Sequence, residues 1–258
     1  MFAELLARSS FSFLRGASHP EEIVEHAFQL DLETVCLCDL DGIYGAVRGW
    51  KKYNELIGRT TTLGGQVEQT ESQFAPTTRY AIGSELTLAL PTIVPGEPGA
   101  LPPENEAITV ALLVRTSLGY ENLCRILTDS HEGREKGVSA TSLDALRAHS
   151  EGLTALIVPP RQPGKTATFQ AQVSALGEVL ERHFSGRAGV AIYRHLDGLD
   201  RTRQRWAERV ASLHDLPLVA TARPSYHRPE RKPLSDVMHC IRRGITLDEA
   251  GTELDGSS

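Results

Sequence analysis

The chain has 258 residues, 40 % of them hydrophobic, with 27 lysines and arginines against 33 aspartates and glutamates. This length and composition are typical of a soluble globular protein with a sizeable core, built as one large domain or two small ones. The net charge of -6 provides no general positive field that would hold a polyanion. A protein that binds nucleic acid by its overall charge is therefore disfavoured.

Neither the cysteines nor the apolar runs indicate a redox, zinc or membrane role. The cysteines show no C-x-x-C spacing and lie in apolar stretches, which favours buried, reduced thiols. They are Cys36, Cys38, Cys124 and Cys240. No charged-then-apolar leader is visible, and no apolar run approaches the roughly 20 residues that a membrane span needs. We expect a cytoplasmic protein without a membrane partner.

Apolar runs alternate with amphipathic stretches along the chain. Strands are predicted at 2–6, 33–42, 79–90, 108–114, 153–160, 189–194 and 216–221, and helices at 20–30, 44–57, 118–130, 142–149, 168–184 and 200–214. Ser18 is the candidate cap of the first helix, which begins with Pro20. Strands separated by helices favour a parallel sheet or a barrel.

Two stretches without periodicity interrupt this order. Residues near 59–78 are rich in Thr, Gln and Gly and are interpreted as a surface excursion, and residues near 91–106 are interpreted as a Pro- and Gly-rich loop. No internal repeat or long linker is visible. We therefore expect one domain over residues 1–258.

In a βα barrel, chemistry is expected at the carboxyl ends of the strands. Asp39 and Asp41 bracket one leucine at such a place, a spacing that can hold Mg²⁺, but Asp41 followed by glycine is typical of a turn. The turn is the preferred interpretation. Glu85 lies within an apolar strand, where a carboxylate has to be paired or exposed, and is therefore a candidate functional residue.

Three segments of the sequence resemble a known family. "FSFLRGASHPEEIVEHA", "GYENLCRIL" and "LPLVATARPSYHRPERKPLSDVMHCIRRGITLDEAG" look like the amino-terminal PHP (polymerase and histidinol phosphatase) domain of bacterial DNA polymerase III alpha subunits, most of all the error-prone branch used in damage tolerance. The similarity runs from Phe2 to about Gly251. It implies an α/β fold, a distorted (β/α)7 barrel of the PHP type, with a Zn or Mn cluster at its carboxyl face in members that keep the ligands.

The resemblance leaves two acids of the family's metal site in place. Glu85 matches the glutamate of a G-x-E motif, and Asp39 matches the aspartate of a T-D-H motif. The other ligand positions carry different side chains: Leu6 and Arg8 at H-x-H, Arg15 at an acidic position, Leu40 at the histidine of T-D-H, and Arg223 and Ser225 at a terminal D-x-H. Only Glu85 is carried over as a firm match.

These replacements predict a site without a metal cofactor. Several vacant ligand positions remove most of the affinity for a cation, and arginine cannot lose its proton to become a ligand. We therefore predict that Glu85, with or without Asp39, is ion-paired to at least one of Arg8, Arg15 and Arg223, which replaces the cation. The alternative is that the arginines reach solvent and water fills the pocket.

A modest basic cluster lies near the end of the chain. Its members are Arg228, Arg231, Lys232, Arg242 and Arg243. A solvated helix face is the preferred interpretation, with DNA contact as the weaker alternative. In the family, this stretch joins the barrel to the polymerase, so residues 228–258 are predicted to be a connection toward a polymerase body that is absent from this chain.

The resemblance therefore implies a degenerate PHP domain that acts as a structural scaffold in DNA synthesis or repair. Its partner would be a polymerase body, in cis or in trans, and DNA would be reached only through that assembly. Alone, the chain is expected to be inactive, because it lacks the carboxylate cluster of two-metal nucleotidyl transfer. The alternative is a PHP-type, metal-dependent phosphoesterase with an altered ligand set around Glu85 and Asp39.

Overall fold

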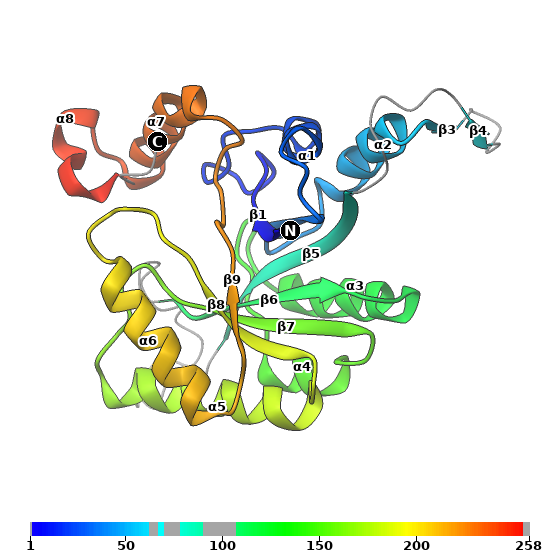
Figure 1. Cartoon of the computed structure of the whole chain (residues 1–258). Coiled ribbons are helices and arrows are strands. Elements are labelled where there is room, and N and C mark those ends of the chain that lie inside the picture. The colour runs from blue at the N-terminus through cyan, green and yellow to red at the C-terminus, as the bar shows by residue number, and fades with distance from the viewer. Residues whose placement is uncertain (1, 62–66, 70–77, 90–106, 255–258) are drawn as a thin grey trace.

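A curled seven-stranded sheet forms the centre of the computed structural model, which describes residues 2–61, 67–69, 78–89 and 107–254. The strand order is β1-β2-β5-β6-β7-β8-β9 (Figure 1). The strands are β1 (Ala3–Ala7), β2 (Thr34–Leu40), β5 (Arg79–Thr87), β6 (Thr109–Val114), β7 (Leu153–Val158), β8 (Ala188–Ile192) and β9 (Leu218–Ala220). The predicted α/β fold, a distorted (β/α)7 barrel, is confirmed.

One strand departs from the expected parallel arrangement. β6 pairs antiparallel with both β5 and β7, whereas the other neighbours are parallel. Antiparallel strands need no crossover helix between them. The sequence pattern has a Pro- and Gly-rich stretch between β5 and β6 but two predicted helices between β6 and β7, so it does not give the direction of β6.

Helices cover the outside of the sheet (Figure 1). They are α1 (Pro20–Gln29), α2 (Ala46–Leu56), α3 (Ser117–His131), α4 (Leu143–Ala148), α5 (Ala167–His183) and α6 (Asp200–Leu213). The cap of α1 differs from the prediction: its N-cap is His19, whose backbone N–H donates to Glu22 Oε2 at 2.8 Å in a capping box. Ser18 is engaged elsewhere, since its Oγ lies 2.7 Å from His227 Nδ1.

Apolar side chains pack on both faces of the curled sheet. The outer layer lies between the sheet and the helices and includes Leu123 and Trp206. The inner layer fills the curl and includes Leu6, Cys36 and Cys38. The thiols predicted to be buried are buried at Cys36, Cys38 and Cys240, and Cys124 is half-buried.

A buried carboxylate links the two edge strands, β1 and β9. Glu4 on β1 accepts hydrogen bonds from Thr221 Oγ1 at 2.5 Å and from the backbone N–H of Ala222 at 2.8 Å. These bonds hold the chain after β9 beside β1. Arg8, directly after β1, and Arg223, just after Ala222, are thereby brought to the same end of the sheet.

Short helices follow β9. They are η1 (Pro229–Arg231), α7 (Lys232–Arg243), α8 (Leu247–Ala250) and η2 (Gly251–Glu253). Gly244, in the left-handed region at φ 68°, ends α7. In Figure 1, α7 and α8 lie at the upper left, on the opposite side from α2.

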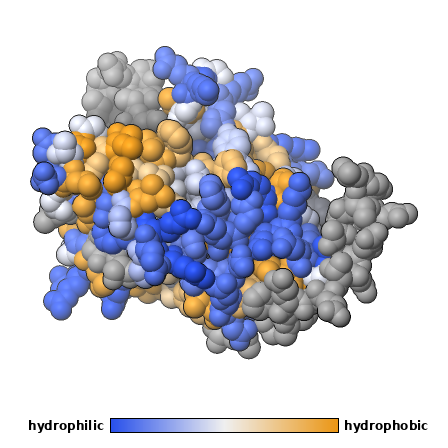
Figure 2. Space-filling model, turned by 90° about the horizontal axis from the view of Figure 1, so that it is seen from above, coloured by the Kyte–Doolittle hydropathy of each residue, from blue (hydrophilic) through white to orange (hydrophobic). Residues whose placement is uncertain are grey.

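Helix α7 turns its polar side toward the barrel and its apolar side outward, the reverse of an ordinary amphipathic surface helix. Its polar residues Asp236 and His239 line a cavity against the barrel. Its apolar residues Leu234, Val237 and Ile241, spaced as one helical face, are exposed. Figure 2 shows hydrophobic residues gathered at the left of the molecule seen from above, the side on which α7 and α8 lie.

Part of the predicted excursion forms a small hairpin. β3 (Arg59–Thr61) and β4 (Val67–Gln69) pair antiparallel. The remainder of this stretch up to residue 77 and the loop predicted near 91–106 lie outside the described residues. Within the described part of the chain, no helix combines the length and the apolar character that crossing a membrane requires.

Candidate functional site

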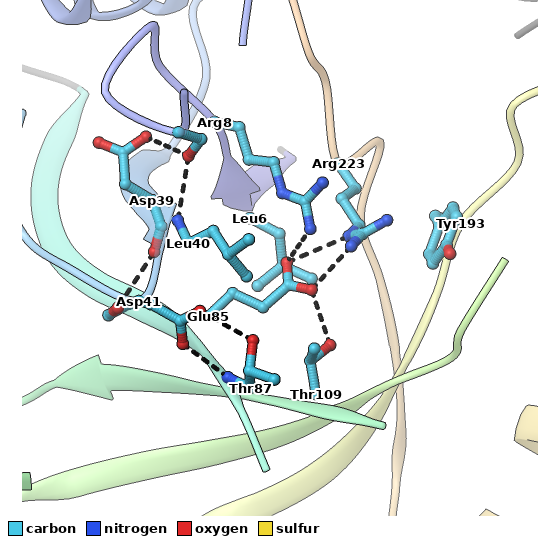
Figure 3. Close-up of polar contacts among 12 residues, drawn as sticks. Leu6, Arg8, Asp39, Leu40, Asp41, Glu85, Thr87, Thr109, Tyr193 and Arg223 are labelled. Carbon is cyan, nitrogen blue, oxygen red and sulfur yellow. Dashed lines mark hydrogen bonds and ion pairs between the residues drawn. The ribbon is translucent and has the colours of Figure 1, made fainter. Parts of the chain in front are cut away.

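Three side chains from distant parts of the sequence meet at the carboxyl end of the curled sheet (Figure 3). Arg8 Nη2 donates to Glu85 Oε2 at 2.8 Å. Arg223 Nη2 donates to Glu85 Oε1 at 2.7 Å, and its Nε donates to Oε2 at 3.3 Å. Thr109 Oγ1 adds a hydrogen bond to Oε1 at 2.7 Å. The predicted ion pair between Glu85 and at least one of the arginines is confirmed.

Glu85 is a buried, fully engaged carboxylate. Its side chain is 1 % exposed, while those of Arg8 and Arg223 are 11 % and 13 % exposed. Burial alone would raise the pKa of Glu85, but the charges of Arg223 and Arg8, with hydrogen bonds from Arg223 and Thr109, hold this pKa well below its usual range. The carboxylate is therefore ionised at neutral pH.

Backbone and aromatic contacts position Arg223. Its φ of 48° lies in the left-handed region, which costs a non-glycine residue on the order of 1–2 kcal/mol. Its guanidinium carbon lies 4.9 Å from the ring centroid of Tyr193. The Tyr193 hydroxyl in turn donates to the backbone carbonyl of Pro159 at 2.8 Å. Arg223 is thus directed at Glu85 by its own backbone and by an anchored aromatic ring.

More than one guanidinium group interacts with the single negative charge of Glu85. Burial lowers the pKa of Arg8, and the positive charges of Arg223 and Arg15 lower it further, against the raising effect of Glu85. Burial likewise lowers the pKa of Arg15, where the attraction of Glu85 is opposed by repulsion from Arg223. Three cations therefore interact with Glu85 in a partly desolvated place, and Arg15 is attracted by Asp41 as well.

Asp39 is occupied by serine donors and does not join the ion cluster in the described part of the chain. It accepts hydrogen bonds from the backbone N–H and Oγ of Ser9, the former at 2.8 Å, and from Ser12 Oγ at 2.7 Å. A Cβ at Gly45 would lie 2.7 Å from Asp39 Oδ2, so only glycine fits there. The surroundings of this carboxylate are closely packed.

Asp41 has the turn role that its Asp-Gly sequence predicts. It has φ 51°, and its carboxylate accepts hydrogen bonds from the backbone N–H and Oγ1 of Thr87 at 2.7 and 2.8 Å. Burial raises the pKa of this carboxyl, against those two hydrogen bonds. Figure 3 shows Asp41 turned toward Thr87 and Asp39 turned away from Glu85, so the acids of this segment do not converge.

The donor set does not fit a divalent cation. Leu6 is buried in the inner layer of the barrel, and Leu40 and Ser225 lie on the wall of the adjoining cavity. Arginine nitrogens occupy both oxygens of Glu85 and have no lone pair to offer a metal. Over residues 2–61, 67–69, 78–89 and 107–254, no group of three or more His, Cys, Asp or Glu side chains is arranged to hold an ion.

The residues of the basic cluster have separate partners. Two of them contact α1: Arg228 donates to Gln29 Oε1 at 2.8 Å, and Arg231 forms an ion pair with Glu22. Within α7, Lys232 forms an ion pair with Asp236 at 2.7 Å, and Arg242 lies 3.1 Å from His239. Arg243 forms an ion pair with Glu253 at 3.2 Å. Arg242 and Arg243 also line the cavity beside Glu85. DNA contact by this cluster stays a prediction.

Sequence reasoning missed two residues near the site. Tyr193 has a second cation over its ring, since the guanidinium carbon of Arg203 lies 5.0 Å from the centroid. Arg203 is buried and pairs with Asp197 at 2.7 Å and with Asp200. Acids three and six residues before an arginine could have signalled this pairing, but nothing local marks Tyr193.

Comparison with known proteins agrees with the fold. The PHP domain family model matches residues 4–204, and the chain belongs to this family. The solved structure of an amidohydrolase from Chromobacterium violaceum aligns with a TM-score of 0.51 at 11 % identity, covering 89 % of this chain and 88 % of that chain. At this identity the likeness concerns the fold alone.

Similar sequences occur within larger proteins. The chain is 34 % identical over 253 residues to an error-prone DNA polymerase of Bdellovibrio bacteriovorus, covering 98 % of this chain and 20 % of that protein. An error-prone DNA polymerase of Anaeromyxobacter sp. is 31 % identical over 262 residues, with 98 % and 19 % covered. The chain thus spans about a fifth of the length of these relatives.

Proposed function

We propose that this chain is a degenerate PHP domain that holds no metal and serves as a structural scaffold of an error-prone DNA polymerase type of protein, in DNA synthesis or repair. The observation that carries this proposal is the bonding of Glu85, both of whose oxygens accept hydrogen bonds from Arg8 or Arg223. The family resemblance assigns this glutamate to a metal cluster. Here, fixed guanidinium groups take the place of the cation.

The position of the ion cluster supports a structural role. Glu85 belongs to β5, Arg8 follows β1, and Arg223 follows β9. The cluster therefore ties together three parts of the sheet, including both of its edges. Without a cation of some kind, the buried carboxylate would be costly to keep.

The exposed apolar face of α7 supports a partner. Contiguous apolar residues on a surface are typical of protein contact sites. We infer that this face packs against a polymerase body, in cis or in trans, since the relatives are about five times as long as the matched region. DNA would be reached through that assembly, which would act in the cytoplasm.

The alternative is a metal-dependent phosphoesterase that uses Glu85 and Asp39. A metal at these residues would have to displace the arginine bonds of one carboxylate and the serine bonds of the other. The two acids also point in different directions (Figure 3). These contacts favour the scaffold.

Activity assays with added metal separate the two functions. The purified chain, supplied with Mn²⁺ or Zn²⁺, is expected to hydrolyse neither phosphomonoesters nor DNA 3′ ends and to extend no primer. Metal-dependent hydrolysis that is lost in Glu85→Ala but kept in the surface control Glu178→Ala would establish the phosphoesterase instead. Hydrolysis that survives both substitutions would come from a contaminant.

A further inference from the structure

An exposed group of apolar side chains lies on α2 and on the loop between β1 and α1. Tyr44, Val47 and Trp50 follow one another at a spacing of three residues, so they share one side of α2 and of the turn before it. Phe11 and Phe13 belong to the loop. The exposed fractions are 61 % for Tyr44 and for Val47, 48 % for Trp50, 37 % for Phe11 and 80 % for Phe13. We call these residues the aromatic patch.

The loop and α2 are in direct contact with each other. The guanidinium carbon of Arg48 on α2 lies 5.8 Å from the ring centroid of Phe11. Gly45, the N-cap of α2, approaches the loop so closely that a Cβ there would lie 2.9 Å from Ser9 Oγ. The loop and the helix therefore present one surface rather than two separate ones.

Trp50 is held in place by two tyrosines. Its ring centroid lies 5.6 Å from that of Tyr53 and 6.2 Å from that of Tyr80. The Tyr80 hydroxyl donates to the backbone carbonyl of Ala46 at 2.8 Å. A side chain that is already positioned loses little conformational entropy when a partner covers it. Anchored tryptophan and tyrosine side chains are typical of the residues that contribute most to protein interfaces.

The area of the aromatic patch suits a contact between two copies of the chain. Aromatic side chains present about 150–250 Å² each, so the exposed fractions correspond to roughly 450 Å² of aromatic surface per chain. The same patch of two copies would together remove roughly 900 Å² of aromatic surface from water, before Val47 and the polar rim are counted. A specific interface buries at least about 1,000 Å² in total. A symmetric pair therefore reaches the lower end of that range.

The charges beside the aromatic patch favour a second copy over a strongly charged partner. Arg48 Nε lies 2.5 Å from Glu21 Oε1, and Lys52 Nζ lies 3.5 Å from Glu25 Oε2 and 3.2 Å from Glu55 Oε1. Cations and acids are thus mixed on α1 and α2, and these residues create no strong field of one sign. In a symmetric interface the surface faces itself, so the cations of one copy can lie against the acids of the other.

We propose that two copies of this chain associate through the aromatic patch, with α2 against α2 in a symmetric pair. In Figure 1, α2 lies at the upper right and α7 at the upper left, so the apolar face of α7 lies away from this contact. The inference goes beyond the proposed function and does not depend on the metal-free state of the Glu85 ion cluster. Together with a polymerase body on α7, the pair would hold two such bodies in one assembly.

Sedimentation equilibrium of the purified full chain tests the association. The average mass is expected to rise from that of one chain toward that of two between low micromolar and millimolar concentrations, as a small interface implies. Val47→Glu is expected to weaken the association at least about tenfold, because it places a carboxylate of each copy in an apolar contact. The matched control Val237→Glu makes the same change on the exposed face of α7 and is expected to associate as the parent does. A far-ultraviolet spectrum of each variant confirms that it is folded.

Tryptophan fluorescence reports on the same surface. The chain has two tryptophans, and Trp206 is buried, so a change of emission with concentration would come from Trp50. Covering Trp50 is expected to shift the emission to shorter wavelength as the concentration rises. The shift should be absent in Trp50→Phe and should need a higher concentration in Val47→Glu.

Each other result contradicts the symmetric pair. A mass of one chain at every concentration would show that the aromatic patch does not bind a second copy. Association that is unchanged in Val47→Glu, or weakened equally in Val237→Glu, would exclude this patch as its specific site. A rise in mass without a shift of the Trp50 emission would place the contact elsewhere. None of these results bears on the metal-free state of Glu85, which the assays with added metal test separately.

Discussion

Glu85 is a buried carboxylate whose charge is balanced by two arginines. A buried ion pair is weak support for high stability, because desolvation offsets most of the attraction. Once the carboxylate is buried, however, losing its partners is costly. The Glu85 ion cluster therefore adds little net stability, but it restricts which side chains can occupy the positions of Glu85, Arg8 and Arg223.

Replacing Glu85 by glutamine is expected to lower the free energy of unfolding by about 3–5 kcal/mol. The amide would leave Arg8 and Arg223 as buried, mutually repelling cations without a counter-charge. Urea unfolding measures the change. Glu178→Gln is the control, since Glu178 forms an exposed pair with Arg182 at 3.6 Å and should change stability by about 1 kcal/mol or less. A midpoint of Glu85→Gln equal to that of the parent would show that the ion cluster does not stabilise the fold.

The lowered pKa of Glu85 also predicts an acid limit to stability. A carboxyl whose pKa is lower in the folded than in the unfolded state stabilises the fold above its unfolded pKa. This contribution is complete above an ordinary glutamate value of about 4.5 and is lost as the pH falls below it. Urea midpoints measured from pH 7 to pH 3 should fall less steeply in Glu85→Gln than in the parent. Parallel curves for the two proteins would show that other groups cause the acid sensitivity.

Among the helices, α7 differs from those that cover the sheet, because its polar side faces the protein and its apolar side faces outward. Asp236 and His239 face the cavity, while Val237 and Ile241 face outward, Ile241 being 61 % exposed. A surface helix normally buries its apolar stripe. An outward apolar stripe is typical of a protein contact site, which agrees with the proposed partner.

Charged residues on this stripe should disrupt assembly without unfolding the chain. Val237→Glu and Ile241→Glu are expected to change the free energy of unfolding by no more than about 0.5 kcal/mol, as is usual for exposed positions. Both should abolish co-purification with the polymerase body that we propose packs against this face. Arg209→Glu on α6 controls for the added negative charge. Co-purification of both α7 variants at the parental level would assign the contact to another surface.

The sequence predicted the existence of the main elements but not every detail of them. Periodicity located α5 and β7 within a residue or two, because long amphipathic or apolar runs dominate those segments. The reversed direction of β6 was not visible, since strand direction depends on the path of the connections. The cap of α1 was misplaced by one residue because the competing contact of Ser18 with His227 is 209 residues away in sequence.

At the scale of the whole molecule, the family resemblance placed Arg8 and Arg223 beside Glu85, which no local pattern could do. The resemblance did not reveal that Ser9 and Ser12 enclose Asp39, or that Tyr193 lies under Arg223. Those contacts depend on how loops pack in three dimensions. The sequence therefore predicted the arginine partners of Glu85 better than the packing around Asp39 and Arg223.

The central claim is that arginines have replaced the metal. Its most direct test is the metal content of the full chain, purified without chelator, dialysed, and measured by inductively coupled plasma mass spectrometry. The account predicts Zn and Mn far below one ion per chain, at the same level in the parent and in Glu85→Gln. One tightly held ion per chain that disappears in Glu85→Gln would contradict it.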